Sequence, residues 1–446
     1  MTTEKSNVFG KFGISFKDRT PLLCMEVNDY YICYDGKKLL KRTRQEINDI
    51  RNFKKNEDGT PSEYLYVKRQ EREKYIKMYN LDPNIKEGDL FKHEYDQYIK
   101  DADIMKKLAK GKCKVNMYRT GNCRDAAMKF FLENVKEILE KKGMVPEVLS
   151  DKEVEYVEGC SNGGLIFAEP YTGLGYQFDG NSWYFNNYMH ENLLVPLKVG
   201  TPKKLSADEF NYMKMKVKDH FFKIGIYRAK VTSPNKDPKW DKLFKFNIGN
   251  YYTHLDLTHA KNLGLNMDIL QDGDDNAIIY ERNQCLTGSE LFRNFHVLYG
   301  IKREHPEVKH VAKGMLNGIW GKLCQRNTVN VYFKDDDYSI GEHGTKVRYR
   351  AIVNKDGEWI GDECLYKGKM FMTEYARLKP FLTARARIEL AKVIAPIHEH
   401  VHRCHTDGFV CDIKPTHLKI GIEHGEFKLE KQGQIEVVNA NKVIWT

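Results

Sequence analysis

Apolar and polar residues alternate in short runs over residues 12–40, which predicts short strands. Residues 42–72 are highly charged and predict a solvated helix or loop. Residues 93–108 carry apolar positions at helical spacing and predict an amphipathic helix, and residues 125–142 predict another helix. The first third of the chain therefore predicts a small region of strands and helices.

The middle of the chain changes pattern several times. Residues 218–231 and 241–257 are rich in strand-forming residues, and residues 328–380 contain several turn-bounded strands. Between them, residues 286–295 begin Leu-Thr-Gly-Ser-Glu, which is typical of an N-capped helix.

Residues 306–321 predict a longer helix, because Pro306 suits a first helical turn. Lys313, Asn317 and Trp320 lie at i, i+4 and i+7 and share one face of that helix. On this face a cation, an amide and an aromatic ring could meet a triphosphate, its sugar and its base. A surface lysine beside a buried tryptophan is the alternative interpretation. The apolar residues that predict the buried stripe are Val308, Val311, Met315 and Ile319.

Strand-forming residues also stand on both sides of Thr406-Asp407-Gly408. Asp-Gly is a strong signal for a tight hairpin turn, so Asp407 is expected at or beside the tip of two paired strands. A strand-like aromatic run from Gly175 ends at Asp179, whose carboxylate could stand beside that hairpin if both belong to one sheet. Two adjacent carboxylates repel each other unless a divalent cation lies between them, and oxygen ligands suit Mg²⁺. A solvated turn aspartate is the alternative for Asp407 alone.

The composition narrows the class of protein. At 446 residues the chain can form two or three domains. Seventy-two basic and sixty-two acidic residues give a net charge of +10, which favours a polyanionic partner, although solvated lysine faces also produce such an excess. The ten cysteines include no Cys-x-x-Cys, so we expect reduced thiols in a cytosol and no structural zinc. No apolar run has the length of a membrane span or a signal peptide, so a cytoplasmic protein without membrane contact is expected.

Three stretches, in this order, resemble the polymerase motifs of family B DNA polymerases. The first is Asp179-Gly-Asn-Ser-Trp-Tyr184, the second is Lys313-Gly-Met-Leu-Asn317-Gly-Ile-Trp320-Gly321, and the third is His405-Thr-Asp-Gly408. Ser161-Asn-Gly-Gly164 resembles the Tyr-x-Gly-Gly of the protein-primed branch, which is found in tailed phages, adenoviruses and linear plasmids. Residues 381–387, Phe-Leu-Thr-Ala-Arg-Ala-Arg, are a further match ahead of the third motif.

The resemblance implies an α+β right-hand polymerase fold, in which a palm built on an antiparallel sheet is joined by helical fingers. It also implies a reduced α/β exonuclease-like region in front of the palm and little or no thumb. The implied division assigns 1–155 to that region, 156–200 and 380–446 to the palm, and 286–327 to the fingers. Residues 201–285 and 328–379 would be insertions, the first contacting a priming protein and the second encircling template DNA. An unrelated pair of strands is the alternative for the second.

The resemblance also implies roles for individual residues. Asp179 and Asp407 would be catalytic and would hold Mg²⁺, with Mn²⁺ as an alternative, together with Gly180. Nucleotide binding is implied for Tyr184, as the sugar gate, and for Lys302, Lys313, Asn317 and Trp320, with Arg303 as the alternative to Lys302. The positions implied to contact DNA are Gly163, Gly164, Gly321, Thr406 and Lys442.

The chain departs from the family pattern at several of these positions. His405 stands where relatives usually carry a further aspartate, so metal affinity is expected to be lower and more pH-dependent. Gly408 replaces a serine, Trp320 a tyrosine and Phe185 a proline. The Lys-x-Tyr that holds the primer end in relatives survives only as Lys442-Val-Ile.

The exonuclease motifs are degenerate as well. Cysteine replaces the first acid at Cys24-Met-Glu26, no middle motif is evident, and the spacing from Tyr98 places Ala102 where an aspartate belongs, with Asp103 one residue late. We therefore expect no proofreading by this chain.

Three functional classes remain open. The first is an active DNA-directed DNA polymerase that uses template and primer DNA and dNTPs in viral or plasmid replication, with protein priming as one option. The second is a weakened DNA-binding subunit, and the third a structural protein on the same fold.

Overall fold

The computed structural model describes residues 14–15, 17–51, 62–110, 114–215, 221–333, 346–353, 357–366 and 370–446. The chain divides into two compact units. The N-terminal unit joins Met1–Lys141 to Asn294–Lys322, and the C-terminal unit joins Lys142–Arg293 to Leu323–Thr446. Both mix helices with sheets, so the fold class is α+β, as predicted.

The N-terminal unit contains a four-stranded sheet in the order β3-β2-β1-β4, in which β1 and β4 are parallel and the other pairs antiparallel. Successive residues of β1 point to opposite faces, and both faces are buried. Leu22 packs with Ile47 of α2, whereas Leu23 packs with Phe91 of α4. The elements are β1 (Thr20–Val27), β2 (Tyr30–Tyr34), β3 (Leu39–Thr43), α2 (Arg44–Arg51), β4 (Tyr64–Lys68), α3 (Arg72–Tyr79), α4 (Glu87–Leu108) and α5 (Cys123–Lys142).

One prediction for this region is wrong in part. The charged stretch 42–72 contains helix α2, as expected, but it also contains strand β4, whose Leu65 and Val67 are buried. The alternation of apolar and polar residues in β4 is short, and charged residues flank it, so the sequence pattern did not predict a strand there. Residues 12, 13, 16 and 52–61 lie outside the described residues.

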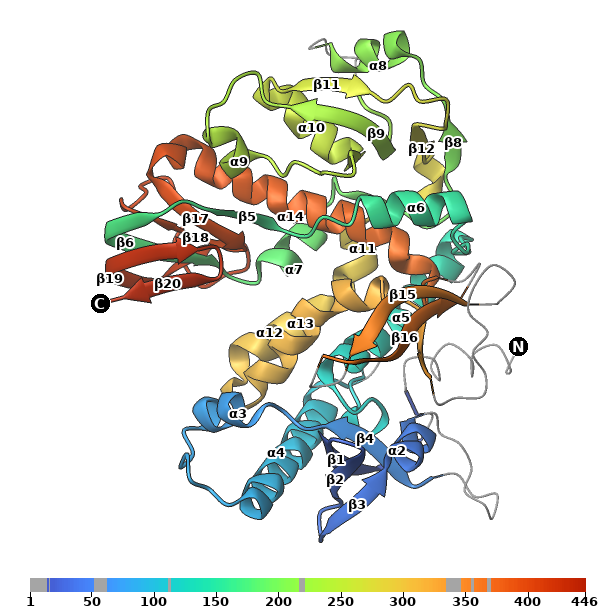
Figure 1. The fold of residues 1–446 in the computed structure, drawn as a ribbon, viewed down its shortest axis with the longest axis vertical. Coiled ribbons are helices and arrows are strands. Elements are labelled where there is room, and N and C mark those ends of the chain that lie inside the picture. Colours follow the sequence, from blue (N-terminus) through green and yellow to red (C-terminus); the bar gives the residue numbers. More distant parts are fainter. Residues whose placement is uncertain are drawn as a thin grey trace. The chain divides into compact units, whose positions relative to one another are not determined.

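The N-terminal unit also includes two helices from later in the chain, α12 (His296–Glu304) and α13 (Lys309–Leu323) (Figure 1). Helix α13 follows a single 3-10 turn at Pro306–Val308, so the helix predicted over 306–321 is confirmed. The predicted stripe of Val308, Val311, Met315 and Ile319 is buried. Lys313 and Asn317, which lie outside this stripe, are exposed.

The C-terminal unit is built on a six-stranded antiparallel sheet in the order β20-β19-β6-β18-β17-β5. Helix α14 (Leu378–Ile394) packs against this sheet and against the short helix α7 (Trp183–Tyr188). Most positions of α14 are buried, which is expected of a helix that is largely apolar all round. The strands are β5 (Leu165–Ala168), β6 (Tyr171–Gly180), β17 (Val401–Thr406), β18 (Gly408–Cys411), β19 (Phe427–Asn439) and β20 (Lys442–Trp445).

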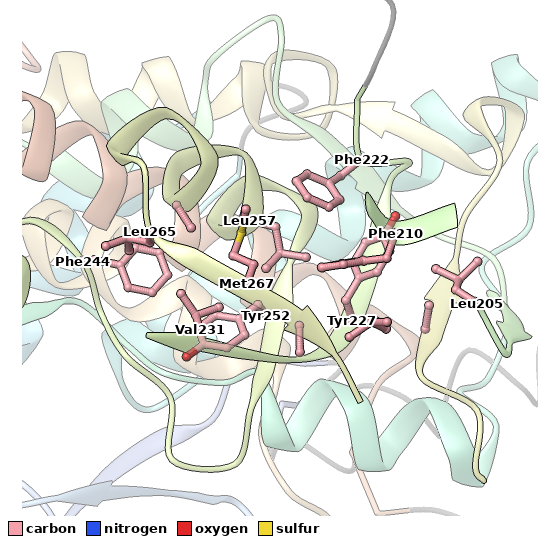
Figure 2. Close-up of a cluster of buried hydrophobic side chains, with 14 of the residues drawn as sticks. Leu205, Phe210, Phe222, Tyr227, Val231, Phe244, Tyr252, Leu257, Leu265 and Met267 are labelled. Atoms are coloured by element: carbon pink, nitrogen blue, oxygen red, sulfur yellow. The ribbon is translucent and has the colours of Figure 1, made fainter. Parts of the chain in front are cut away.

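Residues 201–285 of this unit form a smaller sheet with its own core (Figure 2). The strand prediction for 218–231 agrees with β9, although 216–220 lie outside the described residues. The strand prediction for 241–257 is largely wrong, because Thr253 and Asp256 form a capping box that starts a helix there. The elements are β8 (Thr201–Lys203), α8 (Ala207–Lys214), β9 (Gly225–Thr232), α9 (Lys239–Leu243), β10 (Tyr251–Thr253), α10 (His254–Leu263), β11 (Asn266–Ile269) and β12 (Ala277–Ile279).

Two further regions agree with the predictions. Helix α11 (Gly288–Phe292) begins at the predicted cap, Thr287, whose hydroxyl accepts from the Glu290 amide. In the described part of 328–380, β14 (Thr328–Tyr332), β15 (Lys346–Val353) and β16 (Trp359–Tyr366) form a three-stranded antiparallel sheet. The further elements are α6 (Asp151–Gly159), β7 (Leu194–Pro196) and β13 (Cys285–Thr287).

Candidate active site

The predicted hairpin around Asp407 is confirmed. Strands β17 and β18 are antiparallel neighbours, and Asp407 is the single residue between them. Thr406 takes a positive φ of 63°, which reverses the chain within this short turn. The Thr406 hydroxyl donates to Asp407 Oδ1 over 2.7 Å, and the Asp407 amide donates to the His405 carbonyl over 2.9 Å. The turn therefore orients the carboxylate of Asp407 at the hairpin tip.

Asp179 lies at the end of β6, next to this hairpin. It is in register with Gly408 on one side, and the amide of Gly180 donates to the Asp407 carbonyl over 2.9 Å. A Cβ at position 408 would stand 2.6 Å from the Phe178 carbonyl oxygen and 3.3 Å from Asp179 Oδ1. Glycine at this position therefore lets the hairpin approach β6, so that the two aspartates come together from positions far apart in sequence.

Two further side chains share a row across the sheet with Asp179. The register runs from His405 through Gly408 and Asp179 to Lys428, so these residues face the same side. Lys428 Nζ lies 3.7 Å from Asp179 Oδ2 and 2.6 Å from Glu430 Oε1. Partial burial opposes the charged form, but the two carboxylates outweigh it and raise the pKa of Lys428. Sequence reasoning missed this cation, because it depends on the register between β6 and β19.

The glycine loop 161–164 packs against the same place. A Cβ on Gly164 would lie 2.9 Å from Tyr184 Oη and 3.0 Å from Thr406 Cα, so a larger residue would displace one of them. Gly163 takes a positive φ of 57°. Burial raises the pKa of Tyr184, and the negative charge of Asp407 adds to this effect. The Tyr184 hydroxyl therefore stays protonated and can donate a hydrogen bond.

The two aromatic residues of the first motif lie in different environments. Trp183 is 4% exposed, and its Nε1 donates to the Ala386 carbonyl of α14 over 3.0 Å. Tyr184 is half-buried and reaches the glycine loop. Trp183 is therefore a core residue, and Tyr184 is the aromatic residue beside the aspartates.

A buried ion pair between Arg387 and Asp256 contacts the glycine loop. The Arg387 guanidinium on α14 contacts the Asp256 carboxylate through Nε at 3.0 Å and Nη2 at 2.7 Å. Its Nη1 donates to the Gly163 carbonyl over 3.1 Å. The sequence resemblance marked the stretch that contains Arg387, but its partner Asp256 looked like a strand residue. This network connects α10, in the region 201–285, to the loop at Gly163 and Gly164.

Of the residues predicted to bind nucleotide, Tyr184 lies in the C-terminal unit, whereas the other four belong to the N-terminal unit. Lys313 and Asn317 are exposed on α13, and Trp320 is half-buried on the same side. Lys302 is half-buried on α12, and Gly321, which is predicted to contact DNA, is exposed at the last turn of α13. The roles of these residues stay predictions.

Lys442 is not brought together with the aspartates. It pairs with Asn439 at one end of β19, whereas Asp179 pairs with Lys428 at the other end. The strand between them spans roughly 35 Å at the usual rise per residue. The position expected to hold the primer end therefore lies far from the carboxylates in this unit.

The oxygen ligands at the end of β6 and at the tip of the β17–β18 hairpin suit a hard cation. Asp179 and Asp407 supply carboxylate oxygens, and Gly180 is tied to Asp407 through its amide. Within the described ranges, no cluster of three or more His, Cys, Asp or Glu side chains is arranged to hold a metal. Mg²⁺ is commonly bound by one or two carboxylates, with water and substrate phosphates completing its shell. The pair therefore fits Mg²⁺ better than a metal that needs a full set of protein ligands.

No protein-family model matches the sequence, and neither does any curated protein sequence. Phi29 DNA polymerase complexed with primer-template DNA aligns with a TM-score of 0.58 and 16% identity over 95% of this chain and 86% of that chain. The complex of Phi29 DNA polymerase with primer-template DNA and incoming nucleotide substrates aligns with a TM-score of 0.54 and 17% identity over 93% of this chain and 70% of that chain. The complex with single-stranded DNA aligns with a TM-score of 0.55 and 16% identity over 94% of this chain and 72% of that chain. The chain therefore has a fold similar to that of Phi29 DNA polymerase.

Among the described residues, no helix is both long and apolar enough to span a bilayer.

Proposed function

We propose that this protein is a DNA-directed DNA polymerase that transfers nucleotides from dNTPs to a primer hydroxyl. The observation that carries the proposal is the convergence of Asp179 and Asp407 at neighbouring strand ends. The likeness of the fold to Phi29 DNA polymerase and the ordered motifs in the sequence support the same assignment. In the reaction, the primer 3′-oxygen forms a bond to the α-phosphorus, pyrophosphate leaves, and the hydroxyl proton passes to solvent.

Different residues would bind the metal, the nucleotide and the DNA. Asp179 and Asp407, with the Gly180 backbone, would hold Mg²⁺ or Mn²⁺, which when bound activates the hydroxyl and stabilises charge on the leaving group. Gly164 holds Tyr184 beside these ligands, where its ring would lie under the deoxyribose. Lys313 and Lys302, or Arg303, would neutralise the triphosphate, and Asn317 and Trp320 would orient the nucleotide. Gly163, Gly321, Thr406 and Lys442 would contact DNA.

The finer proposal is protein-primed replication of a viral or plasmid genome in the cytoplasm, for which residues 201–285 would contact the priming protein. This insertion has a core of its own. Its described residues also expose large apolar side chains, and such exposure often marks a contact surface. They are Tyr212, Met215, Phe221 and Ile248.

A weakened DNA-binding subunit is the second candidate function. It is favoured by His405, which supplies no negative charge in the row of Asp179, and by the ammonium of Lys428 beside that carboxylate. A primed template offered one dNTP at a time separates the two functions. A polymerase extends the primer only with the complementary nucleotide. DNA binding without extension, whichever nucleotide and metal are offered, would favour the subunit.

Tyr184 is predicted to exclude ribonucleotides. Tyr184→Val should raise incorporation of a ribonucleotide relative to its deoxyribonucleotide at least about 10-fold, because the ring no longer fills the space beside C2′. Competition between the two nucleotides in primer extension measures this ratio. Trp183→Phe is the matched control, since Trp183 packs in the core, and should leave the ratio unchanged. A change of ratio with Trp183→Phe alone would move the sugar gate to Trp183.

The purified chain is predicted not to digest mismatched 3′ ends in the presence of Mg²⁺. The two acidic residues closest in sequence to the exonuclease motif positions contact separate partners. Glu26 forms an ion pair with Arg44 at 3.3 Å, and Asp103 accepts a hydrogen bond from the Tyr118 hydroxyl at 2.7 Å. Ala102, at the position expected of a metal ligand, is fully buried. Digestion that survives Asp179→Ala but disappears with Asp103→Ala would show a working exonuclease.

A further inference from the structure

Helix α13 packs unusually closely on the first turn of α5. Gly314 and Gly318 lie one turn apart on α13. A Cβ on Gly314 would stand 3.2 Å from Cys123 Cβ, and one on Gly318 would stand 3.0 Å from Arg124 Cγ. Two glycines at this spacing let the helix approach α5 along a single line of its surface. The rotation of α13 about its own axis is therefore constrained.

Polar contacts fix the two ends of the same helix. At the first turn, His310 Nε2 lies 2.6 Å from Asp101 Oδ2 on α4, and Gln97 donates to the other oxygen of Asp101 over 2.7 Å. The Asp101 side chain is only 8% exposed, so the contact is shielded from water. At the last turn, Lys322 forms an ion pair with Asp125 of α5.

The preceding segment is attached to α5 too. Asn294 Nδ2 donates to Asn134 Oδ1 over 2.7 Å, and the rings of Phe130 and Phe295 meet edge to face at 5.0 Å. Residues 294–322 are thus part of the N-terminal unit (Figure 1). The resemblance assigned 1–155 and 286–327 to separate domains, and that division stays a prediction.

His310 lies next to the predicted nucleotide face. It precedes Lys313 by three residues and Asn317 by seven, so the three side chains lie on the same side of α13. An anchor at His310 therefore sets where the Lys313 ammonium and the Asn317 amide are presented.

We propose that Asp101 and His310 are positioning residues for nucleotide binding, and that the N-terminal region serves to orient α13. This inference rests on the proposed polymerase function. The region that lacks the exonuclease acids has a role in synthesis because its helices α4 and α5 hold the nucleotide-binding face in place. Loss of the anchor lets the first turn of α13 shift, and binding groups displaced by about 1 Å can cost up to about 100-fold in efficiency.

The test compares Asp101→Asn with Glu94→Gln. Glu94 is a matched control on the same helix: it is buried, its Oε2 lies 3.1 Å from Arg69 Nε, its Oε1 accepts from the Gln70 amide, and neither partner belongs to α12 or α13. Asp101→Asn should raise the nucleotide KM in primer extension about 10-fold, with a smaller change in kcat. Glu94→Gln should leave KM within about twofold, because it weakens the N-terminal region without touching α13. His310→Gln should reproduce the KM effect, and the double variant should add little to either single change.

Hydrogen exchange of the amides in 309–320 is the second readout and needs no activity. Asp101→Asn should speed exchange there, and Glu94→Gln should not. Unchanged exchange and KM in Asp101→Asn, or an equal KM rise in Glu94→Gln, would overturn the inference while leaving the polymerase assignment intact. If the wild-type chain extends no primer, the polymerase assignment fails, and exchange alone decides whether α4 anchors α13.

Discussion

Replacing either Asp179 or Asp407 with alanine should lower the rate of nucleotide incorporation by about 1000-fold or more. Each substitution removes the carboxylate of one of two residues whose backbones are neighbours at the end of β6 and the tip of the β17–β18 hairpin. With one carboxylate left, the site would lose much of its affinity for a divalent cation. A bound cation stabilises the charge of the transition state by several kcal/mol. Single-turnover extension of a labelled primer at saturating dNTP and Mg²⁺ measures the rate.

Asp412→Asn is the matched control for these variants. Asp412 follows the same hairpin, but its oxygens pair with His400 at 2.8 Å and His402 at 3.1 Å, and it has no predicted role in catalysis. It should retain synthesis within a few-fold of the wild-type rate. DNA binding by the Asp179 and Asp407 variants should persist. Wild-type rates in either alanine variant would remove that residue from the catalytic assignment.

Replacing Arg377 with methionine should lower the free energy of unfolding by about 3–5 kcal/mol, the largest stability effect expected in the C-terminal unit. Arg377 is fully buried and contacts Glu153 through Nε at 2.9 Å and Nη2 at 2.8 Å. Its Nη1 donates to the carbonyls of Glu147 and Leu197. The substitution leaves the Glu153 carboxylate buried, with the Tyr280 hydroxyl as its remaining neighbour in this network. Urea unfolding measures the change.

Two further variants identify the cause. Arg326→Met removes a more exposed partner of an ion pair, to Glu158 at 2.8 Å, and should cost about 1 kcal/mol or less. Arg377→Met combined with Glu153→Leu should recover part of the loss, because no charge is then left buried without a counter-charge. A loss of less than 1 kcal/mol for Arg377→Met alone would contradict the importance of the pair.

The sequence predicted features whose signals are local. Asp407 was placed at a hairpin tip because Asp-Gly stands between two strand-forming runs, and α13 was predicted because its apolar residues recur at helical spacing. Helix α10 was missed because Tyr251 and Tyr252 suggested a longer strand, although its capping box was visible in the sequence. Long-range contacts had no such signal.

The contacts that build the site join residues far apart in the chain. Arg387 and Asp256 are separated by 131 positions, and Arg377 and Glu153 by 224. Neither pairing follows from propensity or periodicity, because the first depends on how α14 packs against α10 and the second on how the residue before α14 packs against α6. The contact of Lys428 with Asp179 likewise depends on strand register. Sequence motifs therefore predicted the candidate reactive residues, whereas their supporting network required the structure.

The most direct test of the proposed polymerase function is extension of a primed DNA template by the purified 446-residue chain, with product length and pyrophosphate followed together. We expect template-directed extension in Mg²⁺, release of one pyrophosphate for each nucleotide added, and loss of both signals when EDTA removes the metal. Binding of the template without extension in either Mg²⁺ or Mn²⁺ would contradict the assignment of a DNA polymerase.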